Sequence, residues 1–250
     1  MTAYSKELII FDLDGTLTPS KMPMEKDVAE AFMRLIERKK VAIISGTSFH
    51  ELEIRAINPL PSGQEGFSNL LLLPASGTQL YVWKGTWCEQ YAEHLSPKEK
   101  ENIMTSFNWA LKAGGYVKPE VIYGDLFEDL GAEITFSGLG QKAPLELKSA
   151  WDPDHVKREL ITVVLKDKLP GYEVRIGGTT SISVTRRGIN KGYGIRKLEE
   201  YLKMPLDHML FVGDALYPDG NDYPAKATGI DCVQVSGPEE TKKLIESWLE

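Results

Sequence analysis

Two aspartates separated by one residue follow an apolar run near the start of the chain. Residues 8–11 are apolar throughout, which predicts a strand buried on both faces, and Asp12 and Asp14 come next. Alternate residues of an extended segment point the same way, so both carboxylates can face one point before Gly15 turns the chain. Charge at the rim of a core is costly unless a positive group meets it. The pattern favours a site for a hard cation such as Mg2+, and the alternative is an acidic turn without chemistry.

A hydroxyl side chain follows the second apolar run in the same way. Residues 41–44 predict another short buried strand, and Ser45 and Gly46 come directly after it. In an open parallel sheet, ligands gather at the carboxyl ends of the strands. The Ser45 hydroxyl and the amides of the glycine-containing turn could therefore bind a phosphoryl oxygen. The alternative is that Ser45 or Ser48 only caps the helix expected at residues 50–57.

A further acidic cluster follows the apolar run at residues 209–212. Asp214 comes after this predicted strand and a glycine, which suits a metal ligand opposite Asp12. Asp222 is a second candidate at the same metal. It would contact the residues that bind the ion and would not bind the ion itself. For Asp219 we expect a solvated loop.

Lys191 is the candidate for balancing these negative charges. Like charges close together raise one another's pKa values, so the cluster needs compensation beyond one divalent ion. Lys191 opens a helix whose apolar stripe runs through residues 193–202, and the helix dipole normally disfavours a cation at that end. The position therefore favours a specific role, and the alternative is a surface lysine.

The remaining pattern divides the chain into a core and an insertion. Buried strands are expected at residues 8–11, 41–44, 70–73, 209–212 and 232–235, and amphipathic helices at 24–40, 193–202 and 244–249. This strand-helix rhythm predicts an α/β fold with a Rossmann-like parallel sheet, formed by residues 1–85 and 188–250. Residues 86–187 instead combine strand segments with helices that start at residues 97 and 152, which indicates an inserted α+β domain with an antiparallel sheet.

Composition limits the class of protein. The 250 residues are 42% hydrophobic, which suffices for a real core, and no segment approaches a membrane span. A net charge of -7 without a dense basic run argues against nucleic acid as the main partner. Residues 1–7 lack a signal peptide's apolar stretch, and Cys88 and Cys232 cannot form a disulfide framework. We expect a cytoplasmic protein without membrane contact, a monomer or homodimer, with a small-molecule partner.

The order of the motifs resembles that of the haloacid dehalogenase-like (HAD) superfamily of phosphatases and phosphotransferases. Its four motifs match Asp12-x-Asp14, Ser45, Lys191, and Gly213-Asp214 with Asn221-Asp222. An insertion between the second and third motifs resembles the cap, or substrate-specificity domain, of the large-cap subclass IIB. The resemblance implies a phosphoryl-transfer enzyme with Mg2+ as cofactor.

The resemblance also implies a role for each motif residue. Asp12 attacks the phosphorus of a phosphomonoester and forms an aspartyl-phosphate, while Asp14 protonates the leaving oxygen and later deprotonates the acceptor. Mg2+ is held by the Asp12 carboxylate, the Asp14 backbone carbonyl and Asp214, and it shares the phosphoryl charge with Lys191 and Ser45. Water as the acceptor makes a phosphatase, and a sugar hydroxyl makes a mutase.

Two stretches resemble eukaryotic-type phosphomannomutases more closely. One is Gly-Asp-x-x-x-Pro-x-Gly-Asn-Asp at residues 213–222, and the other is the pair Gly177-Gly178 shortly before Ser181. The resemblance makes a phosphorylated sugar the expected substrate.

The insertion departs from the phosphomannomutase pattern. Gln141 and Lys148 stand where that family has sugar-phosphate-binding arginines, and Ser183 stands where it has an aspartate. A mutase must hold a second phosphate, which favours bidentate arginines, so the main prediction is a sugar-phosphate phosphatase. The alternatives are a phosphomannomutase that interconverts mannose 6-phosphate and mannose 1-phosphate, and a non-catalytic phosphosugar-binding module. Further candidates for touching the substrate are Gly46, Lys142, Arg175, Ser181, Arg186 and Arg187.

Overall fold

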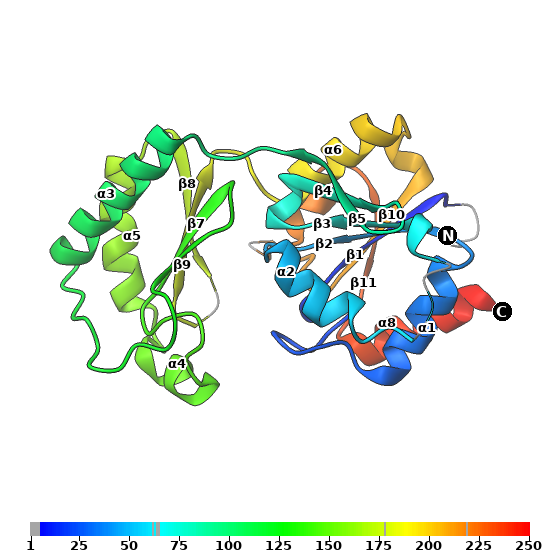
Figure 1. Ribbon diagram of the computed structural model, residues 1–250, viewed down its shortest axis with the longest axis horizontal. Coiled ribbons are helices and arrows are strands. Elements are labelled where there is room, and N and C mark those ends of the chain that lie inside the picture. The colour runs from blue at the N-terminus through cyan, green and yellow to red at the C-terminus, as the bar shows by residue number, and fades with distance from the viewer. Residues whose placement is uncertain (1–5, 62, 64–65, 178, 219) are drawn as a thin grey trace. The chain divides into compact units, whose positions relative to one another are not determined.

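The chain forms two compact units, each with its own sheet and buried core (Figure 1). One unit consists of Met1–Ala92 and Ile189–Glu250, and the other of Glu93–Gly188. Among the described residues, no helix combines the length and the apolarity that a membrane span requires. The predictions for Gly178 and Asp219 lie outside the described residues. The computed structural model describes residues 6–61, 63, 66–177, 179–218 and 220–250.

The first unit is built on a seven-stranded sheet with β1 near its middle. The order is β11-β10-β1-β2-β3-β4-β5, in which the first five strands are parallel and β4 and β5 are antiparallel to their neighbours. This confirms the predicted Rossmann-like parallel core. The carboxyl ends of β1, β2 and β10 lie at one edge of the sheet. The strand bounds are β1 (Leu8–Asp12), β2 (Lys40–Ile44), β3 (Leu70–Leu73), β4 (Gln79–Trp83), β5 (Trp87–Ala92), β10 (Met209–Gly213) and β11 (Asp231–Gln234).

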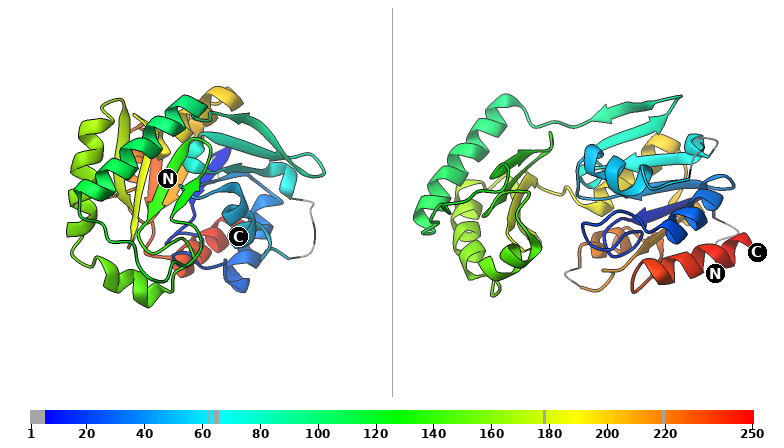
Figure 2. Two further views of the ribbon diagram at one scale, coloured as in Figure 1. Left: turned by 60° about the vertical axis from the view of Figure 1, so that its left-hand side comes forward. Right: turned by 60° about the horizontal axis from the view of Figure 1, so that its bottom comes forward.

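Helices cover both faces of this sheet, which is why its central strands are apolar at every position. Ile9 and Phe11 pack toward α1 (Lys26–Ile36) and α8 (Pro238–Leu249), and the alternate residues of β1 pack toward α6 (Lys191–Leu202). Figure 2 shows α1 and α8 side by side. Shorter helical segments are α2 (Phe49–Leu52), η2 (Glu53–Ile57), η3 (Phe67–Asn69), η4 (Ala75–Gly77), η5 (Leu206–His208) and α7 (Tyr223–Lys226).

The aromatic hairpin of β4 and β5 belongs to the first unit. Residues 86–92 were predicted to belong to the insertion, but β5 pairs with β4 as the edge strand of the core sheet. Packing explains the difference, because the ring centroid of Trp83 lies 5.2 Å from that of Trp87 and 5.2 Å from that of Phe67. The second unit therefore begins at Glu93, and its role as a substrate-specificity domain stays a prediction.

The second unit is a four-stranded antiparallel sheet in the order β6-β7-β9-β8. Figure 1 shows that helices α3 and α5 cover one face of this sheet. That face carries Ile134, Phe136, Ile182 and Val184. The alternate residues of the strands are mostly polar and form the other face. The bounds are α3 (Pro97–Ala113), β6 (Phe127–Asp129), β7 (Glu133–Ser137), α4 (Leu145–Trp151), α5 (Val156–Lys168), β8 (Tyr172–Gly177) and β9 (Ser181–Arg186).

Candidate active site

Asp12 and Lys191 form a buried ion pair at the carboxyl edge of the first unit's sheet. Asp12 is the last residue of β1 and is 1% exposed, and Lys191 is the first residue of α6 and is 4% exposed. The Lys191 ammonium lies 2.5 Å from Asp12 Oδ1 and 2.5 Å from Asp222 Oδ1. Lys191 therefore joins two carboxylates that come from distant parts of the chain.

Close backbone packing holds the start of α6 against this edge. A Cβ on Gly194 would lie 2.8 Å from the carbonyl oxygen of Ser76, so a larger residue would push the helix away from the turn after β3. Asn190 caps the helix, since its side chain accepts a hydrogen bond from the Tyr193 amide at 3.0 Å. These two contacts fix where the Lys191 side chain begins.

An acidic cluster of Asp12, Asp214 and Asp222 surrounds the ion pair. One carboxylate oxygen from each residue lies within 4.8 Å of the others. Asp214 Oδ1 is buried and has no hydrogen-bond partner in the described part of the chain. Gly15, with φ of +78°, gives Asp214 its room, because a Cβ there would lie 2.6 Å from Asp214 Oδ2. An all-oxygen donor set with one unsatisfied buried oxygen fits a hard divalent cation such as Mg2+.

Burial dominates the electrostatics of this cluster. It raises the pKa of Asp12 to about 7, opposed by Lys191 and reinforced by Asp222. Burial also raises the pKa of Asp214, with a further contribution from Asp222. For Lys191, burial acts to lower the pKa, but the charges of Asp12 and Asp222 outweigh it and the pKa is raised. Additional positive charge would therefore be needed to keep every carboxylate ionised at neutral pH.

Asp222 links Lys191 to the loop after β10. It is fully buried, its Oδ1 accepts from the Lys191 ammonium, and its Oδ2 accepts from the Ala215 amide at 3.0 Å. Because both oxygens already have donors, Asp222 is suited to orienting Lys191 and to supporting the oxygens that bind a cation.

Asp14 lies after the same strand, but its carboxylate is held by a different cation. Its Oδ1 accepts from the Arg55 guanidinium at 2.5 Å and from the Lys21 amide at 2.7 Å. Arg55 was not predicted as a site residue from the sequence. The available signal was its spacing from Leu52 and Ala56, which puts an arginine on the buried face of the expected helix.

Ser45 and Gly46 follow β2 at the strand end beside Asp12. Ser45 is buried and its hydroxyl accepts from the Thr47 amide at 3.3 Å, whereas Gly46 is exposed. The cap of α2 is made by Ser48, whose hydroxyl accepts from an amide of the first helical turn at 3.2 Å. Phosphate binding by Ser45 stays a prediction.

Three of the expected substrate-binding residues share the polar face of the second unit's sheet. Arg175 on β8 pairs in register with Ser183 on β9, and Ser181 lies two residues earlier on β9. The Ser181 hydroxyl oxygen lies 3.1 Å from that of Ser137, and Arg175 Nε lies 3.9 Å from a carboxylate oxygen of Glu173. This face therefore offers hydroxyls, one guanidinium and carboxylates.

Two other expected substrate-binding residues have partners inside the second unit. Arg186 donates to both carboxylate oxygens of Glu99, at 2.8 and 2.7 Å, and these bonds lower the pKa of Glu99 to about 2. Lys148 is buried and its ammonium donates to the Gln141 carbonyl at 2.7 Å. Both side chains therefore have partners within the unit, and substrate binding by either of them stays a prediction.

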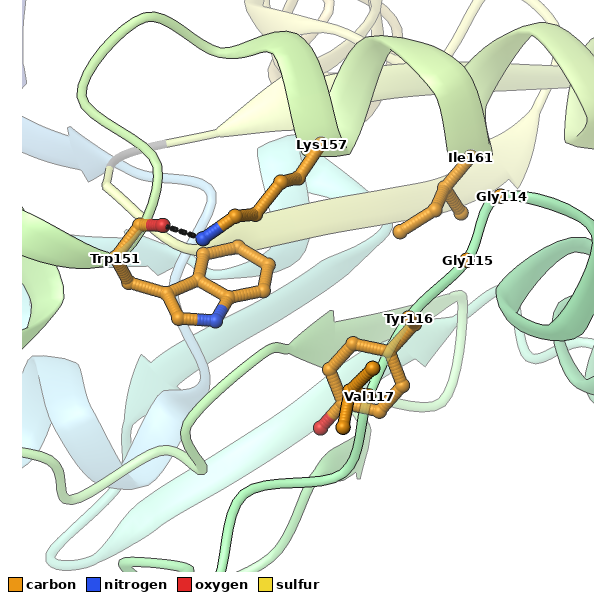
Figure 3. Close-up of a pocket in the computed structure, with 7 residues that line it drawn as sticks. All are labelled: Gly114, Gly115, Tyr116, Val117, Trp151, Lys157 and Ile161. Atoms are coloured by element: carbon orange, nitrogen blue, oxygen red, sulfur yellow. Dashed lines mark hydrogen bonds between the residues drawn. The ribbon is translucent and has the colours of Figure 1, made fainter.

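A cavity of about 310 Å3 also lies in the second unit (Figure 3). The Lys157 ammonium donates to the Trp151 carbonyl and lies 5.2 Å from the centroid of the indole ring. None of the expected substrate-binding residues lines this cavity. Its lining residues are Gly114, Gly115, Tyr116, Val117, Trp151, Lys157 and Ile161.

Glu133 on the polar face predicts a pH-dependent stability for the second unit. Burial raises the pKa of Glu133 from 4.5 to about 7, against the opposing effects of Thr135 and Arg175. The native state then holds a proton that the unfolded state releases, so stability falls as the pH rises from about 4.5 to about 7. We expect Glu133→Gln to be more stable than wild type by about 1–2 kcal/mol above this range, and equal to it below the range.

Urea unfolding, followed by amide hydrogen exchange within residues 93–188 at both ends of this pH range, measures the effect. Glu146→Gln on the exposed α4 is the matched control and should leave the pH dependence unchanged. An E133Q variant whose stability differs from wild type equally at both pH values would contradict the prediction.

Comparison with known proteins links this geometry to one family. The family description "Eukaryotic phosphomannomutase" matches residues 107–250. A probable phosphomannomutase of Caenorhabditis elegans is 27% identical over 255 residues, covering 99% of this chain and 97% of the relative. The phosphomannomutase of Saccharomyces cerevisiae is 26% identical, covering 95% and 92%.

Solved structures share the fold at lower identity. A haloacid dehalogenase-like hydrolase from Bacteroides thetaiotaomicron has a TM-score of 0.66 at 16% identity, covering 97% of this chain and 99% of its own. The IMP-nucleotidase of Plasmodium falciparum has a TM-score of 0.73 at 18% identity, covering 99% of this chain and 70% of its own. At these identities the similarity establishes the fold alone.

Proposed function

Because this chain belongs to the eukaryotic phosphomannomutase family of the HAD superfamily, we propose that it is a phosphomutase interconverting mannose 6-phosphate and mannose 1-phosphate. Its homologues make it an enzyme of phosphoryl transfer, and their names favour the mutase, which was the alternative in the sequence analysis, over the phosphatase. The observation that carries the phosphoryl-transfer part of the proposal is the buried ion pair of Asp12 and Lys191 within the acidic cluster, whereas the choice of a mutase rests on the homologues.

In the proposed reaction, Asp12 is the nucleophile. One carboxylate oxygen forms a bond to phosphorus while the bond from phosphorus to the sugar oxygen breaks, and Asp14 gives its proton to that oxygen. In the second half, the free hydroxyl of a bound hexose monophosphate gives its proton to Asp14 and attacks the phosphorus, which releases Asp12 and forms a hexose 1,6-bisphosphate whose other phosphate can be transferred in the next cycle. Lys191 opposes the repulsion between the carboxylate and the phosphate dianion throughout, because it touches Asp12 directly.

Asp12 and Asp214 would hold Mg2+, together with the Asp14 backbone carbonyl that the family resemblance implies, and Asp222 would support these ligands through Lys191 and the Ala215 amide. When bound, the ion supplies positive charge that lowers the pKa of the carboxylates and stabilises the phosphoryl oxygens. Ser45 and Gly46 would contribute a hydroxyl and backbone amides to the same oxygens.

A phosphatase is the second candidate, and the arginines of the second unit favour it. Arg158 pairs with Asp152 at 2.7 Å with both side chains fully buried, and Arg187 donates to a backbone carbonyl at 2.8 Å. With Arg186 engaged as described, Arg175 is the arginine left on the polar face of the sheet. A mutase needs positively charged side chains that bind a second phosphate, and a phosphatase does not.

Product analysis by 31P NMR separates the candidates. We expect mannose 1-phosphate, Mg2+ and a hexose 1,6-bisphosphate to give mannose 6-phosphate without release of inorganic phosphate, since the bisphosphate primes Asp12. Free phosphate as the main product would favour the phosphatase. Failure to convert any hexose phosphate, together with failure of Asp12 to take up beryllofluoride in the presence of Mg2+, would favour a non-catalytic binding module.

A further inference from the structure

Arg55 is a buried arginine whose charge is met by Asp14. It lies in η2, its side chain is 5% exposed, and its Nη2 lies 2.5 Å from Asp14 Oδ1. The guanidinium also donates to the Thr18 hydroxyl at 3.2 Å and to the Met22 carbonyl at 3.3 Å. Three hydrogen-bond partners fix the orientation of the Arg55 guanidinium, because this group is planar and rigid.

The two oxygens of the Asp14 carboxylate have different surroundings. Oδ1 accepts from Arg55 and also from the Lys21 amide at 2.7 Å. Oδ2 accepts no hydrogen bond from residues that the structure describes, and the side chain is 33% exposed. One oxygen is therefore anchored twice, and the other is available to exchange a proton with a bound molecule.

The first motif thus has two carboxylates with two separate buried cations. Asp12 is paired with Lys191, a compact charge shared with Asp222, and Asp14 is paired with Arg55. Arg55 also reaches Thr18, which forms a backbone bridge with Asp14 across the turn. The same guanidinium therefore fixes the Asp14 side chain and the turn that carries it.

We propose that Arg55 is a positioning residue for the proton transfer of Asp14. With the Lys21 amide, it pins Oδ1 so that Oδ2 gives the proton to the leaving oxygen and takes it from the attacking hydroxyl. This inference rests on the proposed function, in which Asp14 is the acid and base. The competing explanation is structural, because the Arg55 guanidinium also donates to the Met22 carbonyl at 3.3 Å and ties η2 to the loop before α1.

A double-mutant cycle between Arg55 and Asp14 separates these explanations. The probe is mannose 1-phosphate with Mg2+ and a hexose 1,6-bisphosphate, assayed for wild type, Arg55→Gln, Asp14→Asn and the double variant. We expect R55Q to lower kcat about 10- to 100-fold with KM changed less than about 2-fold, as loss of an oriented acid and base would. The double variant should be no slower than D14N, because Arg55 has nothing left to position.

Two further variants complete the test. Arg55→Lys keeps a charge without the fork, so its kcat should lie between those of wild type and R55Q. Arg34→Gln, an equivalent change at a half-exposed arginine on α1, should be indistinguishable from wild type. Losses in R55Q and D14N that multiply in the double variant, or a wild-type kcat in R55K and R55Q, would overturn the inference.

Beryllofluoride trapping, followed by 19F NMR, keeps failure of this inference distinct from failure of the proposed function. We expect R55Q and R55K to form the Asp12 adduct as wild type does, because Asp12 and Lys191 are untouched. Loss of the adduct in both variants, with wild type forming it, would indicate a structural role for Arg55 and overturn the inference. A wild-type protein that forms no adduct and turns over no hexose phosphate would overturn the proposed function, and the inference with it.

Discussion

We expect replacement of Asp12 with asparagine to lower kcat for phosphoryl transfer by at least about 10⁴-fold while the protein stays folded. The amide has the size of the carboxylate but cannot form a stable phosphoryl bond. Folding is spared for an electrostatic reason: burial raises the pKa of Asp12 to about 7 and Asp222 repels it, so a neutral side chain is tolerated there. Lys191 keeps Asp222 as its partner in the variant.

Turnover of mannose 1-phosphate and urea unfolding of the same preparation measure this result. Asp27→Asn serves as the control, because Asp27 is a half-exposed aspartate on α1 of the same unit. Its kcat should match that of wild type. Undiminished turnover by D12N would remove Asp12 from the mechanism and leave the ion pair with Lys191 as a structural feature only.

The carboxyl edge of the core sheet was predictable because its residues follow uninterrupted apolar strands. A strand that is buried on both faces is apolar at every position, whereas a half-buried strand alternates apolar and polar residues. The first polar residue after such an apolar run therefore marks the end of the strand. Asp12, Ser45 and Asp214 were located in this way, and all three lie at the ends of β1, β2 and β10.

The direction of each side chain at that edge was less predictable. Asp12 and Asp14 were expected to face one point, but the partner of Asp14 Oδ1 was not predicted: it is Arg55, whose position depends on how η2 packs beside the loop before α1. Nothing in the spacing of the motif itself contains that contact. A contact between charged side chains that are far apart in the chain leaves no periodic pattern in the sequence. It therefore cannot be predicted from a single sequence in the way that a helix or a strand can.

The second unit shows the same limit at a helix start. A helix was expected from Asp152, but α5 begins at Val156 and a separate helix, α4, precedes it. Asp152 Oδ1 accepts from the Lys157 amide at 2.9 Å, and its Oδ2 accepts from Arg158 Nε at 2.7 Å. Asp152 therefore accepts a hydrogen bond from an amide of the first turn of α5, although it lies before the N-cap position, which His155 occupies. An ordinary N-cap residue makes such a bond from the position directly before the helix.

Replacing Lys191 with methionine should cost both activity and stability, because this lysine is the protein's own counter-charge for the cluster. Methionine keeps most of the side-chain volume but leaves Asp12 and Asp222 buried without a cation. Breaking a buried pair in this way costs about 3–5 kcal/mol, and we expect kcat to fall at least about 10³-fold. Lys26→Met, at a lysine whose side chain is 91% exposed, should change stability by less than about 0.5 kcal/mol.

The pH and Mg2+ dependence of K191M distinguish lost charge from lost packing. Without Lys191, the pKa of Asp12 rises further above its ordinary value of 3.8, so the native state retains a proton that the unfolded state releases. The variant should therefore be least stable at alkaline pH and should recover as the pH falls. Mg2+ should stabilise K191M against urea more than it stabilises wild type, since the ion then supplies the missing positive charge. A stability loss that is equal at all pH values and insensitive to Mg2+ would assign Lys191 to packing, and phosphoryl transfer would then need another source of positive charge beside Asp12.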